Sequence, residues 1–348
     1  MKMLFWPINK LIALNNYPVV WQSKRFTFVG FGVFAAIETL AIAACLYVYL
    51  VASGHQLNQV PVFTLPLGVV CVWLGARSFH WWALGAKFWR KPKKYLNETG
   101  FYLQGGLIGG MVAIAVLSQW STVPLLVLAD GLAWGVLLGQ FIGRLGCYNY
   151  GCCFGKPTSL SLSVCYSHPA SKVARWRNQW LHMRLHPTQL YMAGQNIIGF
   201  GVVLYVMQEP LDQGFIFFLV MLWEGVGRLM VEPLRADMSF TEGRNWRTVQ
   251  VASGLAVCGV LGIGWLNGLS VTAVAVVEFS DVFGASLSQF LNVPHLWWAN
   301  TLALMAILFG YGLHGDQLGT FPKWKLVWAD LRQGVIKNRN QSGKNTHV

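Results

Sequence analysis

Long apolar stretches recur along this 348-residue sequence and constrain its fold more than any other feature. The hydrocarbon core of a bilayer is about 30 Å thick, and a helix needs roughly 20 apolar residues to cross it. Lipid cannot satisfy backbone hydrogen-bonding groups, so such stretches cross as helices. The sequence therefore predicts an all-α polytopic membrane protein with seven or eight helices. The stretches lie near residues 28–52, 62–85, 101–118, 122–142, 187–207, 213–231, 247–267 and 296–314.

The balance of charge agrees with this class. Only 11% of the residues are charged and 55% are hydrophobic, which is unlike a soluble globular protein. The formal net charge is +13, and the basic residues lie mostly in loops beside the apolar stretches. This distribution favours anionic lipid headgroups as partners and argues against nucleic-acid binding.

The apolar stretches divide the chain into three parts. Residues 1–27 are expected to form an N-terminal interfacial segment, because they lack a recognisable signal-peptide cleavage site. Residues 28–320 are expected to form the transmembrane domain. Residues 321–348 mix tryptophan and aliphatic residues with basic ones, which predicts an amphipathic helix on the lipid surface before a disordered end. Stretch 270–292 could be a short span, a re-entrant segment or a loop.

Ionisable residues inside the apolar stretches or at their ends are costly in lipid, so each is a functional hypothesis. Glu224, Arg228 and Glu232 follow at four-residue intervals, so they lie on one helical face and can pair with each other. A salt bridge between helices is one interpretation of Glu224. The arginines outnumber the neighbouring carboxylates, and guanidinium groups suit phosphate oxygens. The residues concerned are Arg77, Asp130, Arg144, Glu224, Arg228, Glu232 and Arg235.

Two further motifs lie where apolar stretches begin. The glycines of YLQGGLIGG, Tyr102 to Gly110, would let a helix approach a neighbouring helix or a ligand closely. HPTQLY, His186 to Tyr191, has a proline near a first helical turn, which places His186 and Gln189 at the membrane interface.

Taken in this order, the motifs resemble those of the prolipoprotein diacylglyceryl transferase family. The resemblance implies a bundle of about seven transmembrane helices around a central, lipid-accessible cavity in a bacterial inner membrane. It runs from about Leu74 to Asp237 through GAR (Gly75 to Arg77), QGGLIG (Gln104 to Gly109), GQFIGRLG (Gly139 to Gly146), HPTQLY and GRLMVEPLR (Gly227 to Arg235).

Orientation in the membrane has two opposed predictions. Basic residues gather in loops 86–100 and 144–185, which the positive-inside rule places in the cytoplasm. The resemblance instead places the signature loop, residues 143–186, on the periplasmic face. The charge rule loses its force there if the arginines bind phospholipid phosphates, and we expect the periplasmic placement.

The resemblance also implies an activity. A transferase of this family moves the diacylglyceryl group of phosphatidylglycerol to a lipobox cysteine thiol of a prolipoprotein, and glycerol phosphate leaves. Cations must stabilise the leaving phosphate and a base must activate the thiol, whereas no cofactor or metal is implied. The resemblance indicates Arg144, Arg228, Gln104, Cys147 and Cys152 as catalytic positions. It indicates Arg77, Gly105, Gly106, Asn149, Gly155, His186, Gln189, Tyr191, Glu232 and Arg235 as substrate-binding positions.

The sequence departs from the family pattern where protons would be handled. Gln104 stands in place of a histidine, and Cys147, Tyr150 and Cys152 replace two asparagines and a glutamate of the signature, with Asn149 as a partial substitute for the lost amide. Two alternatives follow from these departures: a homologue that acts on another acceptor, or a lipid-binding protein without catalysis.

Four cysteines in or near the signature, Cys147, Cys152, Cys153 and Cys165, allow several interpretations. A zinc site would need His168 or His186 to complete it. A disulfide suits an oxidising periplasm. A thiol could carry the lipid group transiently or form a polar cavity wall, and buried cysteines are otherwise ordinary packing residues.

Overall fold

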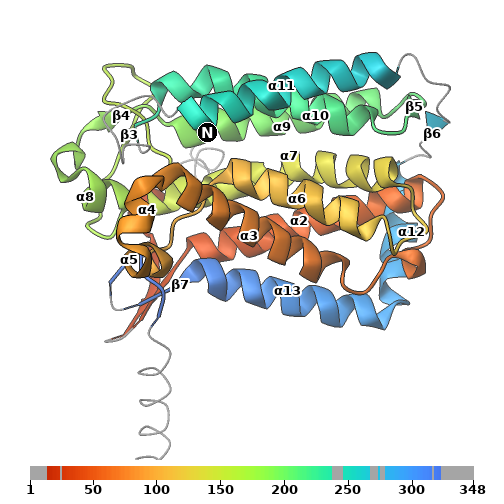
Figure 1. The fold of residues 1–348 in the computed structure, drawn as a ribbon, viewed down its shortest axis with the longest axis horizontal. Helices are drawn as coiled ribbons and strands as arrows, with labels where there is room; N and C mark the ends of the chain where they lie inside the picture. The colour runs from red at the N-terminus through yellow and green to blue at the C-terminus, as the bar shows by residue number, and fades with distance from the viewer. Residues whose placement is uncertain are drawn as a thin grey trace, which may run out of the picture.

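The computed structural model describes residues 14–23, 26–236, 246–266, 273–274, 279–315 and 317–322. The described chain is mostly helical, and its long helices run roughly alongside one another (Figure 1). Each of the eight predicted stretches corresponds to one long helix, so the helical prediction is confirmed, although α7 continues past the predicted end at 142 to Tyr150, within the expected signature loop. These helices are α2 (Phe31–Ala52), α3 (Thr64–Leu84), α6 (Leu103–Leu117), α7 (Leu125–Tyr150), α9 (Thr188–Val206), α10 (Phe215–Val231), α11 (Trp246–Leu266) and α13 (Pro294–Gly312).

Three of the described helices are long and apolar enough to cross a membrane: α2, α7 and the part of α11 from Val249 to Leu266. A fourth crossing results if the segments Val282–Leu291 and Pro294–Gly312 are one span, although they meet at 91°. The stretch 270–292 thus contains a helix, α12 (Phe279–Leu291), bent sharply against α13, and Glu278 in this stretch lies outside the described residues. The prediction that seven or eight helices cross the membrane stays a prediction.

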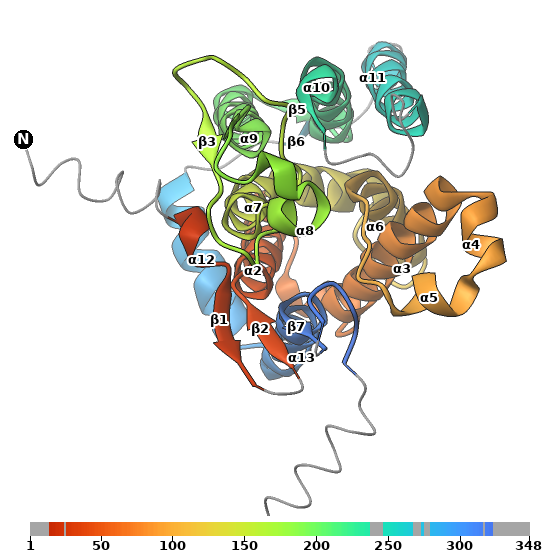
Figure 2. The ribbon, with the colours of Figure 1, turned by 90° about the vertical axis from the view of Figure 1, so that its left-hand side faces the viewer.

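Short elements connect the long helices and add a little β-structure that the all-α prediction lacked. Strands β1 (Val19–Gln22), β2 (Thr27–Val29) and β7 (Leu313–His314) form an antiparallel sheet beside the ends of α2 and α13 (Figure 2). Pairing satisfies backbone groups of the loops. The other short elements are α4 (Ala86–Arg90), α5 (Pro92–Asn97), β3 (Val164–Cys165), α8 (Lys172–Trp176), β4 (Arg184–Leu185), β5 (Leu211–Asp212), the 3-10 helix η4 (Glu232–Leu234) and β6 (Ala273–Val274).

Glycines on one face of α7 explain how closely α2 packs against it. Gly131, Gly135, Gly139 and Gly143 recur every four residues, and a Cβ atom on each would meet side chains or backbone of α2. Such small-residue stripes let helices approach within van der Waals contact. The contact at Gly143 is with the carboxylate of Glu38, so this packing holds an acidic side chain beside α7.

The glycine motif of α6 packs against α3 in the same way. A Cβ atom on Gly105 or Gly109 would meet the backbone of α3 at Gly75 or Cys71. Gly105 is therefore explained by helix packing, which was one of its two predicted meanings.

Asp130 in α7 is a buried charge with a structural partner. Its carboxylate accepts hydrogen bonds from the backbone N–H groups of Gly214 (2.6 Å) and Phe217 (2.8 Å) and from the hydroxyl of Tyr49 (3.2 Å). These backbone groups belong to the first turn of α10, where a negative charge is favourable. Asp130 thus ties α7 and α2 to the beginning of α10.

The two terminal segments expected from the sequence lie largely outside the described residues. Of residues 1–27, the structure describes 14–23 and 26–27, and of residues 321–348 it describes 321 and 322. The three-part division of the chain therefore stays a prediction.

Candidate active site

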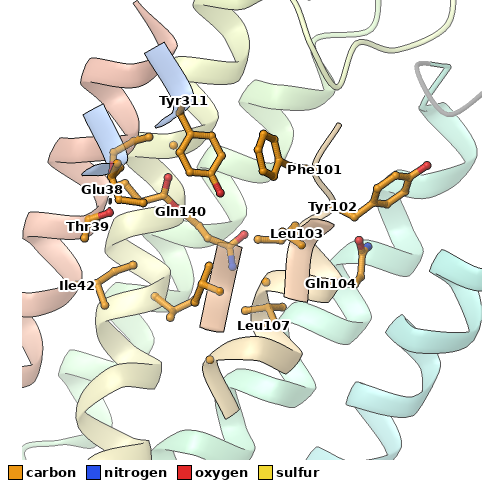
Figure 3. A pocket seen from close by; sticks show the side chains of 18 of the residues that line it. Glu38, Thr39, Ile42, Phe101, Tyr102, Leu103, Gln104, Leu107, Gln140 and Tyr311 are labelled. Atoms are coloured by element: carbon orange, nitrogen blue, oxygen red, sulfur yellow. Dashed lines mark hydrogen bonds between the residues drawn. The ribbon is translucent and has the colours of Figure 1, made fainter. Parts of the chain in front are cut away.

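A cavity of about 670 Å³ lies among α2, α3, α6, α7 and α10. Most of its wall is apolar, with polar groups gathered toward the end where α7 finishes. Cavities of this size, mostly apolar and with few polar groups, are typical of ligand-binding sites. Figure 3 shows one part of this wall, where the side chains of Glu38 and Tyr311 lie beside that of Gln140. The shape and polarity suit a ligand with a long apolar part and a charged end.

All five residues expected at catalytic positions line this cavity: Arg144, Arg228, Gln104, Cys147 and Cys152. They come from α6, α7, the loop after α7, and α10. Basic residues of the described wall outnumber acidic ones, since Arg144, Lys172, Arg175, Arg228 and Arg235 face Glu38, Glu98 and Glu224. The cavity is therefore suited to an anionic ligand.

Arg144 projects from the last turns of α7 and is buried. Its Nη2 donates to Oε1 of Gln140 at 3.5 Å, and its Nη1 donates to Sγ of Cys153 at 3.8 Å. Both contacts are long, and sulfur is a weak acceptor. The guanidinium group therefore keeps hydrogen-bonding capacity for a ligand oxygen.

The second arginine site lies at the end of α10. Nη2 of Arg228 forms an ion pair with Oε2 of Glu232 at 3.0 Å, as the four-residue spacing predicted. Nε of Arg235 lies 4.0 Å from the same oxygen. The other terminal nitrogen of Arg228, Nη1, donates to Sδ of Met192 at 3.7 Å, and sulfur is a weak acceptor. One carboxylate thus orients two guanidinium groups.

Glu224 does not take the predicted place in this pairing. Arg228 reaches one turn onward to Glu232, and no ion pair within 4.0 Å joins Glu224 to it in the described residues. From α10, the Glu224 carboxylate lies near the side chains of Arg144 and Gln140 and within electrostatic range of Arg228. It therefore belongs to the α7 side of the cavity.

Three thiols meet beside Arg144. The Sγ atoms of Cys147, Cys152 and Cys153 all lie within 4.8 Å of one another. All seven cysteines of the chain are free thiols in the structure, so the disulfide interpretation is not supported. Hydrogen bonds from Cys147 and Cys152 hold the pKa of the Cys153 thiol well below its ordinary value. Arg235 and Arg144 lower this pKa further through their positive charge.

Of the four cysteines in or near the signature, three have sulfur atoms that lie close together. Cys165 is exposed on β3 and lies outside this cluster. His168 and His186, the expected completing ligands, also lie outside it, because Nδ1 of His168 accepts from the backbone of Ala170 and Nδ1 of His186 faces the hydroxyl of Tyr191. A zinc site completed by either histidine is therefore wrong for this structure.

A further polar group at this end of the cavity was not expected from the sequence. Nη2 of Arg175 donates to the hydroxyl of Tyr150 at 2.6 Å, and that hydroxyl lies 3.4 Å from Nε2 of His314. Burial, with the charge of Arg175, lowers the pKa of His314 to about 4. Because 164 residues separate Tyr150 from His314, no local pattern in the sequence joins them.

Glu38 is another residue that the sequence analysis did not single out. It lines the cavity from α2 and lies within electrostatic range of Arg144. A signal was present, because an acidic residue within an apolar stretch is costly in lipid. The same reasoning that selected Arg144 would have selected Glu38.

Arg77 is buried but is held by backbone groups. Its Nη1 donates to the carbonyl oxygens of Glu98 (2.6 Å) and Gly100 (3.0 Å), and its Nη2 to those of Tyr95 (3.2 Å) and Leu96 (3.1 Å). The rings of Trp81, Phe101 and Phe321 lie 5.0–5.4 Å from its guanidinium carbon. These contacts organise the end of α5 and the residues that follow it, 95–100, and Arg77 lies outside the described cavity wall.

The remaining expected substrate-binding residues divide between the cavity and its supports. Gly106 and Arg235 line the cavity. Asn149 donates to the carbonyl oxygens of Leu14 and Tyr17, and Gln189 donates to that of Cys152. These two side chains hold loops in place. The residues that the structure places outside the described wall are Arg77, Gly105, Asn149, Gly155, His186, Gln189, Tyr191 and Glu232.

Comparison with known proteins agrees with this geometry. A sequence model of the prolipoprotein diacylglyceryl transferase family matches residues 18–266, which is more than half of the chain. The chain belongs to this family. The match contains every residue of the arginine sites and the three thiols, whereas α12, α13 and His314 follow it in the chain.

Relatives in several bacteria carry the family's activity in their names. A phosphatidylglycerol–prolipoprotein diacylglyceryl transferase of Clostridium tetani is 27% identical over 223 residues, which cover 63% of this chain and 86% of that protein. One of Lysinibacillus sphaericus is 27% identical over 205 residues, 58% of this chain and 72% of that protein. One of Acaryochloris marina is 34% identical over 187 residues, 51% of this chain and 66% of that protein.

Proposed function

We propose that the chain is a membrane transferase that moves the diacylglyceryl group of phosphatidylglycerol to the cysteine thiol of a prolipoprotein. The observation that carries this proposal is the apolar cavity whose polar end contains Arg144 and Arg228. The family and the names of its relatives support the same activity. The substrates are an anionic phospholipid and a secreted precursor protein, and the reaction uses the bundle of about seven membrane-spanning helices expected for the family.

The apolar wall receives the acyl chains and the arginines receive the phosphate. Burial of lipid methylene groups against apolar side chains contributes about 0.8 kcal/mol for each group. Arg144 on α7 and Arg228 on α10 then bind phosphate oxygens, because the long or weak hydrogen bonds of these two side chains leave donor groups available. Glu232 and Arg235 hold Arg228 in its orientation.

The reaction transfers the diacylglyceryl group, through its phosphate-bearing carbon, from a phosphate oxygen to the acceptor sulfur. The acceptor sulfur attacks the glyceryl carbon that bears the phosphate, the carbon–oxygen bond breaks, and the electron pair leaves with glycerol phosphate. Arg144 and Arg228 stabilise the charge that builds on this leaving group. Gln104 lines the cavity on α6 and is available to hydrogen-bond the lipid, but an amide cannot accept the thiol proton as the family's histidine could.

The same chemistry argues against a transient lipid carrier on Cys147 or Cys152. Transfer to either sulfur would form a thioether, whose thiolate is a poor leaving group compared with a phosphate monoester. A lipid group placed there would stay there. These thiols therefore serve the reaction in another way, or line the cavity.

The experiment that tests the activity uses the purified full chain, phosphatidylglycerol labelled in its acyl chains, and a synthetic lipobox peptide. We expect mass spectrometry to find the diacylglyceryl mass on the peptide cysteine and glycerol phosphate in the aqueous phase. Labelled lipid on a different acceptor would indicate the divergent homologue. Saturable phosphatidylglycerol binding with no product from any thiol acceptor would indicate the non-catalytic lipid-binding protein, which Gln104 and Cys152 favour.

The protein is proposed to lie in the bacterial inner membrane with residues 143–186 on the periplasmic face. Cys165, which is exposed in this loop, offers a native probe. A membrane-impermeant maleimide should label wild-type protein in intact cells and should not label that position in a Cys165→Ser variant. Labelling that requires cell lysis would favour the cytoplasmic placement given by the positive-inside rule.

A further inference from the structure

Cys147, Cys152 and Cys153 form a cluster at the polar end of the cavity that phosphate binding does not explain. Their Sγ atoms lie within 4.8 Å of one another, and all three residues line the cavity. Cys147 and Cys152 are buried, and Cys153 is partly buried. One side of the cluster thus faces the space in which the lipid headgroup and the acceptor thiol would meet.

The backbone after α7 brings these thiols together by an uncommon turn. Gly151 ends the helix with φ +72°, and Cys153 also has a positive φ, +56°, which is uncommon for residues with a side chain. The backbone N–H of Cys152 donates to the carbonyl of Cys147 at 3.1 Å. The chain therefore folds back so that two loop thiols face the thiol of the last helical turn.

We propose that Cys147, Cys152 and Cys153 bind one Zn²⁺ ion whose fourth coordination position faces the cavity and holds the acceptor thiol as a thiolate. This inference rests on the proposed transferase function. A Zn–S distance of about 2.3 Å separates sulfurs around one ion by roughly 4 Å, which the observed spacing accommodates. Three protein ligands and one open position are the arrangement of catalytic zinc sites. Thiolate ligands also select zinc over magnesium, calcium or manganese.

The neighbouring arginines suit this ion despite their charge. Three thiolates and Zn²⁺ together carry one net negative charge. Nη1 of Arg144 lies 3.8 Å from Sγ of Cys153, so a guanidinium group adjoins the anionic complex. The same arginine is proposed to bind the lipid phosphate. It would therefore bring the zinc-bound sulfur and the phosphate-bearing carbon to one place, as a displacement reaction requires.

Zinc would activate the acceptor thiol, which the amide of Gln104 cannot do because it cannot accept the thiol proton. A thiol that coordinates zinc is deprotonated, and its proton passes to solvent. The bound sulfur forms a bond to the glyceryl carbon while the carbon–oxygen bond breaks, and the electron pair leaves with glycerol phosphate. The product thioether is a neutral and weaker ligand, so it leaves the ion. Electrons and atoms balance without an oxidant or reductant.

Metal content tests the site directly. The full chain, purified in detergent with a reductant and loaded with ZnCl₂, should retain about one zinc per chain by elemental mass spectrometry. Replacement of zinc by Co²⁺ should produce thiolate charge-transfer absorption. Cys152→Ser and Cys153→Ser should each lose most of the metal, whereas Cys165→Ser, which changes an exposed thiol outside the cluster, should retain it. Wild-type protein that binds neither zinc nor cobalt, or that holds only copper, would overturn the proposal.

Two measurements keep this test independent of folding and of the transferase proposal. In wild-type protein, ZnCl₂ should protect three thiols from N-ethylmaleimide while Cys165 is still modified. Removal of zinc should reduce transfer about 100-fold or more, as loss of an acid–base group does, and leave phosphatidylglycerol binding unchanged. Equal transfer by zinc-free protein would refute the zinc proposal and leave the transferase standing. Zinc bound at this site in a protein that transfers no lipid to any thiol would refute the transferase and, with it, the activating role of the ion.

Discussion

Two kinds of buried arginine occur in this molecule. The terminal nitrogens of Arg77 donate to four backbone carbonyls in residues 95–100, at and after the end of α5, and its guanidinium group lies among three aromatic rings. Arg144 and Arg228 have a sulfur contact each, together with one amide or one carboxylate. Backbone carbonyls accept hydrogen bonds from both terminal nitrogens of Arg77, whereas each of the other two arginines has a weakly accepting sulfur as one of its partners.

This difference separates support from ligand binding better than burial or charge does. All three residues are buried, at 1–6% exposure, and all three carry charges that are costly in or beside an apolar stretch. What differs is the strength of their acceptors and the space that they face. Four carbonyl oxygens leave Arg77 little to offer a phosphate, whereas weak sulfur contacts leave Arg144 and Arg228 able to exchange them for phosphate oxygens.

The largest effect is expected at the cavity arginines. Arg144→Lys or Arg228→Lys keeps the charge but loses the fork that binds two phosphate oxygens, so transfer should fall about 100- to 1,000-fold. The measurement is the rate of peptide lipidation at saturating phosphatidylglycerol. Arg184→Lys, at an exposed arginine, serves as the control and should leave the rate nearly unchanged. Normal rates in both cavity variants would remove the distinction between the two kinds of arginine.

The opposite pattern is expected at Arg77. Arg77→Lys cannot reproduce hydrogen bonds to four carbonyls, so it should lower the free energy of unfolding by about 3 kcal/mol. Thermal unfolding in detergent measures this loss. The rate of transfer per folded molecule should stay within about twofold of wild type, because the residue lies outside the described cavity wall. A stable Arg77→Lys protein with weak phosphatidylglycerol binding would place Arg77 with the ligand-binding group instead.

Glu232 should give an intermediate effect. Glu232→Gln removes the carboxylate that orients Arg228 and Arg235, so kcat should fall about tenfold, as expected for a misplaced but retained charge. KM for phosphatidylglycerol should not rise, because the charge that is lost is negative. Glu209→Gln, at an exposed position, is the matched control. A rise in KM with unchanged kcat would mean that Glu232 acts on lipid binding rather than on the orientation of Arg228.

The smallest effect concerns pH and His314. Its pKa is about 4 in the folded protein and 6.5 in the reference state, so unfolded chains bind more protons as pH falls. Its contribution to stability is therefore present above pH 6.5 and is lost progressively as pH falls toward 4, by about 1 kcal/mol between pH 7 and 5.5. Thermal unfolding at both pH values measures it, with His314→Gln expected to show the smaller difference. Equal pH dependence in the two proteins would contradict the buried, neutral imidazole.

Local patterns predicted much of this structure, and pairings between distant segments account for what they missed. The eight helices followed from apolar stretches, and the Arg228–Glu232 pair followed from four-residue spacing. The role of Arg77 depends on carbonyls 18 to 23 residues away, at the end of α5 and just after it, and no local pattern in the sequence joins them to Arg77. The cluster of Cys147 with Cys152 and Cys153 depends on left-handed residues in a turn, which composition alone does not indicate.

The sheet that joins β2 to β7 has a consequence in time. Thr27 pairs with His314 and Phe28 with Leu313. Strand β2, near the beginning of the described chain, therefore cannot form this pairing until β7, near its end, has been synthesised. At roughly 5–20 residues per second, ribosomes make these two strands on the order of tens of seconds apart. Arg144 and Arg228 are synthesised within that interval, whereas the His314 end of the cavity is made only at its close. A growing chain therefore cannot complete its lipid site until nearly all of its described helices have been made.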